Sequence, residues 1–124
     1  MITAASRQSQ VAYHAGMSAE QQVASDYERR GLTIARRRWR SAAGEVDLIA
    51  RDGAALIFVE VKKSKNFARA AERVSARQQQ RIYASAACFL ASEPAGADTE
   101  ARFDVALVDE IGAVQIVENA FGGY

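Results

Sequence analysis

The sequence has few of the residues on which several classes of enzyme depend. Its 124 residues include one cysteine, Cys88, and one histidine, His14. A single cysteine excludes an intrachain disulfide and a zinc site built from several thiolates, and it fits a reducing, cytoplasmic location. One histidine and one cysteine leave little for Cys–His catalysis, so a bound metal ion would need oxygen ligands. Cys88 stands among apolar residues, and we expect it to be a buried, unreactive thiol.

Long apolar runs and targeting signals are also scarce. No apolar stretch approaches the ~20 residues of a membrane-spanning helix, and residues 1–10 lack the apolar core of a signal peptide. We therefore expect no membrane partner. The chain has one proline, and 49% of its residues are hydrophobic and 25% charged, which is typical of an ordinary globular protein. We predict a flexible N-terminal tail over residues 1–15, a single domain over 16–121 and a C-terminal tail over 122–124.

The net charge of +1 hides an uneven distribution along the chain. Residues 1–92 carry 15 basic and 8 acidic side chains, whereas residues 93–124 carry 1 basic and 7 acidic ones. The total alone would argue against a polyanionic partner. The split removes that argument, because the basic charge lies in the same part of the chain as the acidic motif described below.

Hydrophobic periodicity predicts two helices and five strands in the order α-β-β-β-α-β-β. Ser18 and Gln21 have the spacing of a capping box at the start of the first helix. The third strand is apolar on both faces, which is typical of a central strand. The predicted helices span residues 18–30 and 68–91, and the predicted strands span 32–40, 45–50, 55–62, 103–108 and 114–117.

Charged residues interrupt the two most apolar of these strands. Glu45 and Asp47 stand in one strand, and Glu60 and Lys62 stand in the next. Because side chains alternate along a strand, the members of each pair share a face. The sequence therefore places carboxylates and an ammonium group inside two otherwise apolar segments.

The register of the predicted hairpin decides whether these charges meet. A turn signal at residues 52–53 joins the two strands. A two-residue loop would pair Asp47 with Phe58, and a four-residue loop over 52–55 would pair Asp47 with Glu60. Either register brings the acids and the lysine to one face of the sheet, whereas a loop of odd length would place them on opposite faces.

Converging carboxylates repel one another, and their burial costs free energy. A hard divalent cation relieves both costs, and Mg²⁺ commonly takes one or two carboxylates together with water and substrate phosphate. With Lys62 placed to orient a water or to stabilise developing negative charge, the cluster suits phosphodiester hydrolysis. The alternative is an internal salt-bridge cluster in which Lys62 neutralises Asp47 and Glu60.

Five segments of the chain resemble a known family, and the resemblance spans residues 16–121. Gly44–Ala50 (GEVDLIA) followed by Phe58–Lys62 (FVEVK) is similar to the YraN-like family of small bacterial proteins, within the PD-(D/E)xK nuclease superfamily. Gly16–Ala24, Ile34–Arg40 and Arg102–Val105 match as well. The resemblance implies an α/β fold (α+β, mixed sheet) with a restriction-endonuclease-like αβββαβ core, in which helices flank a central mixed sheet.

The resemblance also implies a site. Glu20 matches the first-helix glutamate that completes the site in Holliday-junction-resolvase-like members. The implied catalytic residues are Asp47, Glu60, Lys62 and Glu20. The implied ligands of Mg²⁺ or Mn²⁺ are Asp47, Glu60, the backbone carbonyl of Val61 and Glu20. No small-molecule cofactor is implied.

Basic residues bracket the acidic motif, and we predict that they contact phosphates along a groove. The alternative for each of them is a solvated face of a helix or strand. Two positions depart from the family pattern, because Ser64 and Gln78 stand where basic residues are common. The predicted nucleic-acid-binding residues are Arg36, Arg38, Arg40, Lys63, Lys65, Arg69, Arg73, Arg77, Gln78 and Arg81.

Three functions fit these patterns, in order of preference. The first is a metal-dependent nuclease that hydrolyses DNA phosphodiester bonds, on branched or damaged DNA. The second is a non-catalytic nucleic-acid-binding module on a nuclease-like fold, and the third is an interaction protein in which the charged cluster is structural. Homodimerisation is a further hypothesis, since a small nuclease that cuts two strands commonly acts as a dimer.

Overall fold

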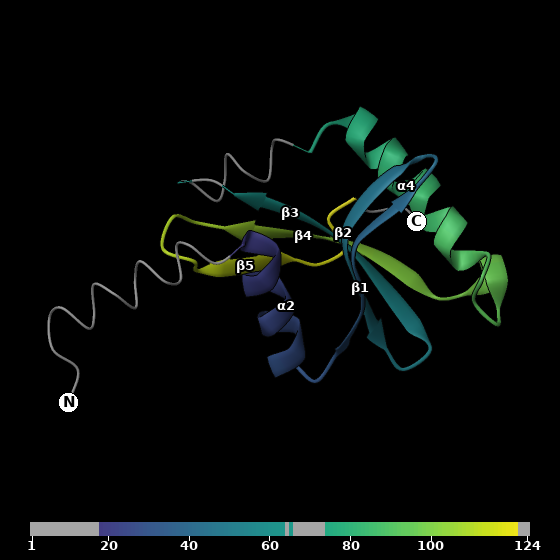
Figure 1. Cartoon of the computed structure of the whole chain (residues 1–124), viewed down its shortest axis with the longest axis horizontal. Coiled ribbons are helices and arrows are strands. Elements are labelled where there is room, and N and C mark those ends of the chain that lie inside the picture. The colour runs from purple at the N-terminus through teal and green to yellow at the C-terminus, as the bar shows by residue number, and fades with distance from the viewer. Residues whose placement is uncertain (1–17, 64, 66–73, 122–124) are drawn as a thin grey trace, which may run out of the picture.

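A five-stranded mixed sheet, with helix α2 on one face and helix α4 on the other, forms the framework of the molecule (Figure 1). The structure is a computed structural model that describes residues 18–63, 65 and 74–121. The predicted order of helices and strands is confirmed, and the predicted tails, residues 1–15 and 122–124, lie outside the described residues. The elements are α2 (Ala19–Arg29), β1 (Thr33–Ser41), β2 (Gly44–Asp52), β3 (Ala55–Lys63), α4 (Ala76–Leu90), the short 3₁₀ helix η1 (Gly96–Asp98), β4 (Ala101–Val108) and β5 (Val114–Val117).

The strands lie in the order β1-β2-β3-β4-β5. Strands β3 and β4 are parallel and the other neighbours are antiparallel, so the sheet is mixed. Strand β3 is the central strand, as its apolar residues predict, and α4 lies in the crossover from β3 to β4. The fold is therefore an α/β fold with an αβββαβ core of the restriction-endonuclease-like arrangement. Among the described residues, no helix has the length and apolarity that a membrane crossing requires.

Helix α2 begins where the sequence predicts. The Ser18 hydroxyl accepts a hydrogen bond from the backbone N–H of Gln21 at 3.1 Å, which satisfies one of the free amides of the first turn. In a complete capping box the Gln21 side chain would accept from the backbone N–H of Ser18. Here the Gln21 side-chain oxygen accepts a hydrogen bond from the Arg37 guanidinium of β1 at 3.0 Å. Val23, Ala24 and Tyr27 of α2 pack on the sheet, so this helix is tied to β1 by both apolar and polar contacts.

Helix α4 covers the opposite face through Ile82, Ala86 and Phe89. The Trp39 ring meets the Phe89 ring edge-on, with centroids 5.4 Å apart. Cys88 falls outside this apolar stripe and is exposed. The prediction of a buried thiol is therefore wrong, because the apolar neighbours of Cys88 in the sequence are not its neighbours on the helix surface.

The predicted start of the second helix is also wrong. Instead of running without a break from residue 68, the helix begins at Ala76, after Ser75 as its N-cap. Ser75 and Gln78 form a complete capping box. The Ser75 hydroxyl accepts a hydrogen bond from the backbone N–H of Gln78 at 3.1 Å, and the Gln78 side-chain oxygen accepts one from the backbone N–H of Ser75 at 3.3 Å. This Ser-x-x-Gln spacing is a start signal that helix propensity alone conceals. Residues 66–73 lie outside the described part of the chain.

Asp104 of β4 is a fully buried charge under α2. Its carboxylate accepts hydrogen bonds from the Tyr27 hydroxyl at 2.7 Å, from the Arg102 guanidinium at 3.0 and 3.1 Å, and from the backbone N–H of Asn119 at 3.0 Å. Burial and the neighbouring carboxylate raise the pKa of Tyr27 far above its usual range, so the phenol stays a proton donor. This network joins α2, β4 and the segment after β5.

Candidate functional site: an acidic pocket between the sheet and helix α4

Asp47 and Glu60 lie at the point where β2 and β3 stop pairing. The last pairs of the ladder are Ile49 with Phe58 and Leu48 with Val59. One step further, this register sets Asp47 opposite Glu60, as in the second of the two predicted registers. The loop has two residues, 53–54, instead of the four residues, 52–55, of that predicted register, because Asp52 pairs with Ala55.

Backbone and side-chain contacts hold the two carboxyl groups in place. The Asp47 Oδ2 atom accepts a hydrogen bond from the backbone N–H of Val61 at 2.8 Å. This side-chain hydrogen bond joins β2 and β3 just beyond their last backbone pair, Leu48 with Val59. The Lys62 Nζ atom lies 3.6 Å from Glu60 Oε1, and both side chains are largely buried. Asp47, Glu60 and Lys62 are therefore brought together, as the alternation of the strands predicts.

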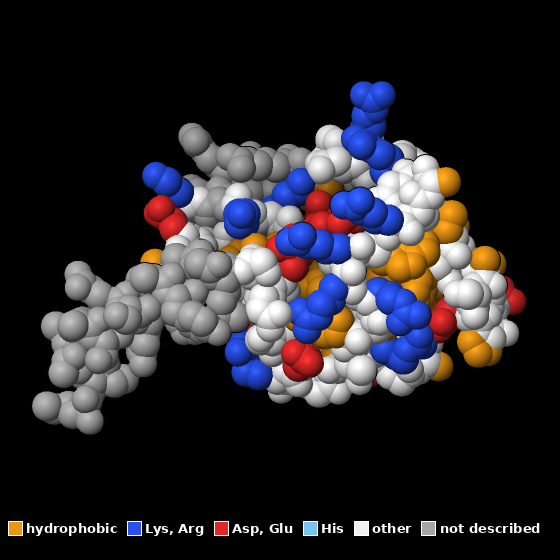
Figure 2. All heavy atoms as spheres, viewed as in Figure 1, with side chains coloured by type: hydrophobic (Ala, Val, Ile, Leu, Met, Phe, Trp, Pro, Cys, Tyr) orange, Lys and Arg blue, Asp and Glu red, His pale blue; other side chains and the backbone are white. Residues whose placement is uncertain are grey.

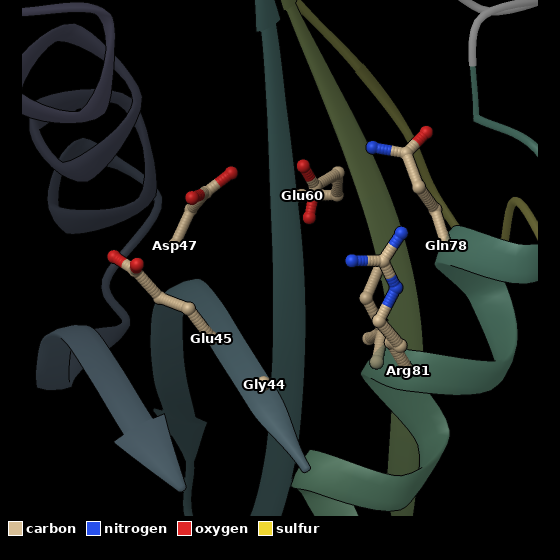
Figure 3. Close-up of a pocket in the computed structure, with 7 residues that line it drawn as sticks. Gly44, Glu45, Asp47, Glu60, Gln78 and Arg81 are labelled. Atoms are coloured by element: carbon tan, nitrogen blue, oxygen red, sulfur yellow. The ribbon is translucent and has the colours of Figure 1, made fainter. Parts of the chain in front are cut away.

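A pocket of about 210 Å³ opens in front of these carboxylates (Figure 3). One wall is formed by β2 and β3 and the other by α4. Figure 3 shows the carboxylates of Asp47 and Glu60 facing one another across the pocket, with the Arg81 guanidinium directed toward Glu60. The lining residues are Gly44, Glu45, Asp47, Glu60, Gln78, Arg81 and Ile82.

The pocket raises the pKa values of both central acids. Burial raises the pKa of Glu60 to about 7, and the charge of Asp47 adds to this effect, while Lys62 opposes it. Burial also raises the pKa of Asp47, against the lowering effect of the Val61 hydrogen bond. The metal-free pair therefore holds a proton near neutral pH, since two buried carboxylates disfavour double ionisation.

Two further acids stand near the pair, each beside an arginine of β1. Glu20 of α2 lies close enough to raise the pKa of Asp47, and it forms an ion pair with Arg38 at 3.7 Å. Glu45 also raises the pKa of Asp47, and it lies 3.5 Å from Arg40. Strand alternation predicts that Glu45 shares a face with Asp47, but only the structure shows that Glu45 lines the pocket.

Basic side chains surround this acidic region. Figure 2 shows a group of Lys and Arg side chains in the middle of one face of the molecule, around a smaller group of Asp and Glu side chains. Gln78 and Arg81 line the pocket itself. Arg69 and Arg73 lie outside the described residues. The remaining predicted binding residues that the structure places on the surface are Arg36, Arg38, Arg40, Lys63, Lys65 and Arg77.

The donor set limits how a metal ion would be held. Within the described part of the chain, no group of three or more His, Cys, Asp or Glu side chains is arranged to bind a metal. Two adjacent buried carboxylates remain, and this set fits Mg²⁺ or Mn²⁺, because Mg²⁺ retains several waters and needs only one or two carboxylates. Glu20, paired with Arg38, lies near Asp47 but is not one of the residues that line the pocket. The N–H of Val61 faces Asp47, and its carbonyl as a ligand stays a prediction.

The fold and the paired carboxylates define the class, a small restriction-endonuclease-like α/β domain with an acidic pocket at the end of its β2–β3 hairpin. Comparison with known proteins gives the family. The chain belongs to the uncharacterised protein family UPF0102, the YraN family, whose model matches residues 19–108. This agrees with the family resemblance of the sequence motifs.

Curated relatives carry the same family name. A UPF0102 protein of Cereibacter sphaeroides is 59% identical over 112 residues, which cover 90% of this chain and 96% of the relative. A UPF0102 protein of Ruegeria pomeroyi is 61% identical over 108 residues, covering 87% and 88% of the two chains. A UPF0102 protein of Azorhizobium caulinodans is 41% identical over 119 residues, covering 96% and 91%.

Proposed function

We propose that this protein is a metal-dependent nuclease that hydrolyses DNA phosphodiester bonds, with Asp47 and Glu60 as the metal ligands. The observation that carries the proposal is the pair of half-buried carboxyl groups that line one pocket with a basic surround, where partial burial raises both pKa values. Carboxyl groups whose pKa values are raised by desolvation and by a neighbouring acid cluster at functional sites, because burying like charges costs free energy. A divalent cation removes that cost.

The residues around the pair have separate roles in this proposal. Asp47, fixed by the Val61 amide, and Glu60 would hold Mg²⁺ or Mn²⁺, which when bound supplies Lewis-acid polarisation of the phosphate and acidifies the attacking water. The Lys62 ammonium, beside Glu60, orients that water and stabilises negative charge that develops on the phosphate. Arg81, on the opposite wall of the pocket, attracts the phosphate group.

The exposed arginines of β1 support DNA as the substrate. Arg36, Arg38 and Arg40 are all exposed on one edge strand of the sheet. A row of cations is suited to the phosphate backbone and carries little base specificity. Recognition by DNA shape, as in branched or damaged DNA, is therefore the form of selectivity that we propose.

A cleavage panel tests the proposed function. Labelled single-stranded, duplex, flap and four-way-junction DNA of matched sequence are incubated with Mg²⁺, with Mn²⁺ or with EDTA. We expect cleavage with either metal, a preference for the branched substrates, and none in EDTA. Absence of cleavage from all four substrates in both metals would contradict the proposal.

A non-catalytic DNA-binding module on the same fold is the second candidate, and the exposed arginines favour it equally. It predicts binding that weakens steeply with salt and that persists in EDTA. Salt-sensitive binding without cleavage in the same panel would support it over the nuclease. Homodimerisation stays a prediction, and light scattering at tens of micromolar protein tests it.

A further inference from the structure

Trp39 is the single tryptophan of the chain, and it lies on the edge strand β1. Its indole ring meets the Phe89 ring of α4 edge-on, with centroids 5.4 Å apart, and packs against the core under α4. The side chain is nevertheless only partly buried, and its neighbours in the strand, Arg38 and Arg40, are exposed. Part of a large aromatic side chain therefore stays accessible beside two cations.

The backbone of Arg38 puts this ring on the pocket side of the sheet. Residues two apart in a regular strand lie on the same side, yet Arg37 reaches Gln21 of α2 whereas Trp39 packs against α4. Arg38, between them, has a φ of 48°, in the left-handed region, which is uncommon for an arginine. Backbone strain of this kind concentrates at functional sites. Here it moves Trp39 to the face on which the pocket opens.

Trp39 lies next to the acidic pocket on both of the elements that it contacts. It pairs with Val46 of β2, which stands between two residues that line the pocket. On α4, Phe89 is two turns beyond Ile82 of the pocket lining, on the same face and about 10 Å further along the helix axis. That length corresponds to about three nucleotides of a stacked strand at about 3.4 Å each.

An accessible indole beside arginines suits a nucleobase and its phosphates. The face of an indole ring stacks on any base, and the neighbouring guanidinium groups attract the backbone. In an intact duplex, the neighbouring bases cover both faces of each base. Only an unpaired base, as in a single strand or at a branch, offers a free face to a side chain.

We propose that Trp39 is a stacking platform for an unpaired nucleobase, and that it is the residue by which this protein distinguishes branched DNA from an intact duplex. The inference rests on the proposed function in that DNA is the substrate, but it requires neither a bound metal nor cleavage. It defines the substrate as DNA with an unpaired base within a few nucleotides of the phosphate in the pocket.

Fluorescence of the original protein gives the first test. Because Trp39 is the single tryptophan, indole emission reports on this site alone, and a base that stacks on an indole quenches its emission. A single strand, a flap and a blunt duplex of matched sequence are added in EDTA at low salt, and anisotropy of the labelled DNA measures how much is bound. At equal occupancy we expect quenching by the single strand and the flap, and little by the duplex. Unchanged emission with bound single strand and flap would overturn the proposal.

Substitutions give the second test. Trp39→Leu keeps an apolar side chain against Phe89 but has no aromatic face, and Trp39→Phe keeps a smaller ring. Phe121→Leu is the matched control. Phe121 is also a partly buried aromatic residue of the core under α4, but it stacks on Phe103 of β4, which two strands separate from β1.

The affinity for the flap relative to the blunt duplex is the quantity to compare. We expect flap binding in EDTA to be about tenfold weaker in Trp39→Leu, within about threefold in Trp39→Phe and unchanged in Phe121→Leu. Duplex binding should stay within about twofold in all three, which also shows that each variant is folded. If the leucine variant fails to fold, the phenylalanine variant and the quenching decide. Equal losses for flap and duplex, or an equal loss in Phe121→Leu, would assign Trp39 to packing alone and overturn the proposal.

These measurements separate the role of Trp39 from the proposed nuclease activity. Flap binding that depends on Trp39, without cleavage in Mg²⁺ or Mn²⁺, would contradict the nuclease and support the stacking platform. Cleavage of the flap by Trp39→Leu with unchanged affinity would do the reverse. Absence of binding to any of the three DNAs at low salt would contradict both.

Discussion

Replacing Glu60 with glutamine is expected to abolish metal-dependent DNA cleavage and, in the same protein, to raise the stability of the metal-free fold. Glutamine keeps the shape of the side chain but removes one of the two proposed ligand charges. Loss of several kcal/mol of transition-state stabilisation corresponds to a rate at least about a hundredfold lower. Cleavage rate and thermal unfolding of the two proteins would be measured side by side.

The gain in stability follows from the raised pKa of Glu60. A carboxyl whose pKa rises to about 7 on folding is less stable as an anion in the folded state than in the unfolded chain, in spite of the Lys62 contact. A neutral isostere avoids this cost. Glu45→Gln is the matched control, because Glu45 lines the same pocket but is more exposed. Unchanged cleavage in Glu60→Gln would rule out Glu60 as a metal ligand.

The same shift predicts how stability depends on pH. In the unfolded chain Glu60 loses its proton near pH 4.5, whereas in the fold it keeps the proton to about pH 7. Between these values the folded state binds more protons, so its stability falls as the pH rises, by up to about 3 kcal/mol. Other carboxylates titrate in this range too, so the quantity to measure is the difference in unfolding free energy between the original protein and Glu60→Gln. A difference that is flat from pH 4.5 to 7.5 would contradict the burial of the pair.

The second large effect is expected at Asp104. Asp104→Ala should lower the free energy of unfolding by about 3–5 kcal/mol, because it leaves the Arg102 guanidinium and the Tyr27 hydroxyl without their buried acceptor. Denaturant unfolding measures the loss. Asp98→Ala is the control, since Asp98 is exposed on η1 and should change stability by less than about 0.5 kcal/mol.

The two Asp104 outcomes have different meanings. A loss in the expected range with unchanged DNA cleavage would assign Asp104 to the fold alone, as its burial and its hydrogen bond with Tyr27 of α2 indicate. A decrease of less than about 1 kcal/mol in the free energy of unfolding would contradict the conclusion that the hydrogen bonds of Asp104 hold α2, β4 and the segment after β5 together.

The order of elements and the meeting of Asp47 with Glu60 could be predicted from the sequence because both depend on local rules. Alternation in the strands and a turn signal at residues 52–53 suffice to bring the two acids to one hairpin end. The family motifs add the identity of the fold, and the family match confirms that resemblance.

Other features depend on contacts between distant segments, which periodicity does not contain. Asp104 reads as a polar residue of an alternating strand, yet Tyr27, far away in the sequence, makes it a buried acceptor. Arg38 reads as one of several arginines, yet its backbone is left-handed, with a φ of 48°, and its side chain pairs with Glu20. The exposure of Cys88 depends on the side of α4 that faces the sheet.

The central claim is that Asp47 and Glu60 form a metal-dependent cleavage site, and its most direct test is DNA cleavage by Asp47→Asn beside Asp52→Asn. Both substitutions remove one negative charge from β2, but Asp52 is exposed at the turn and lies at the far end of the strand. On one labelled branched DNA in Mn²⁺, the proposed function predicts cleavage at the original rate by Asp52→Asn and none by Asp47→Asn. Equal cleavage by the two variants would contradict it.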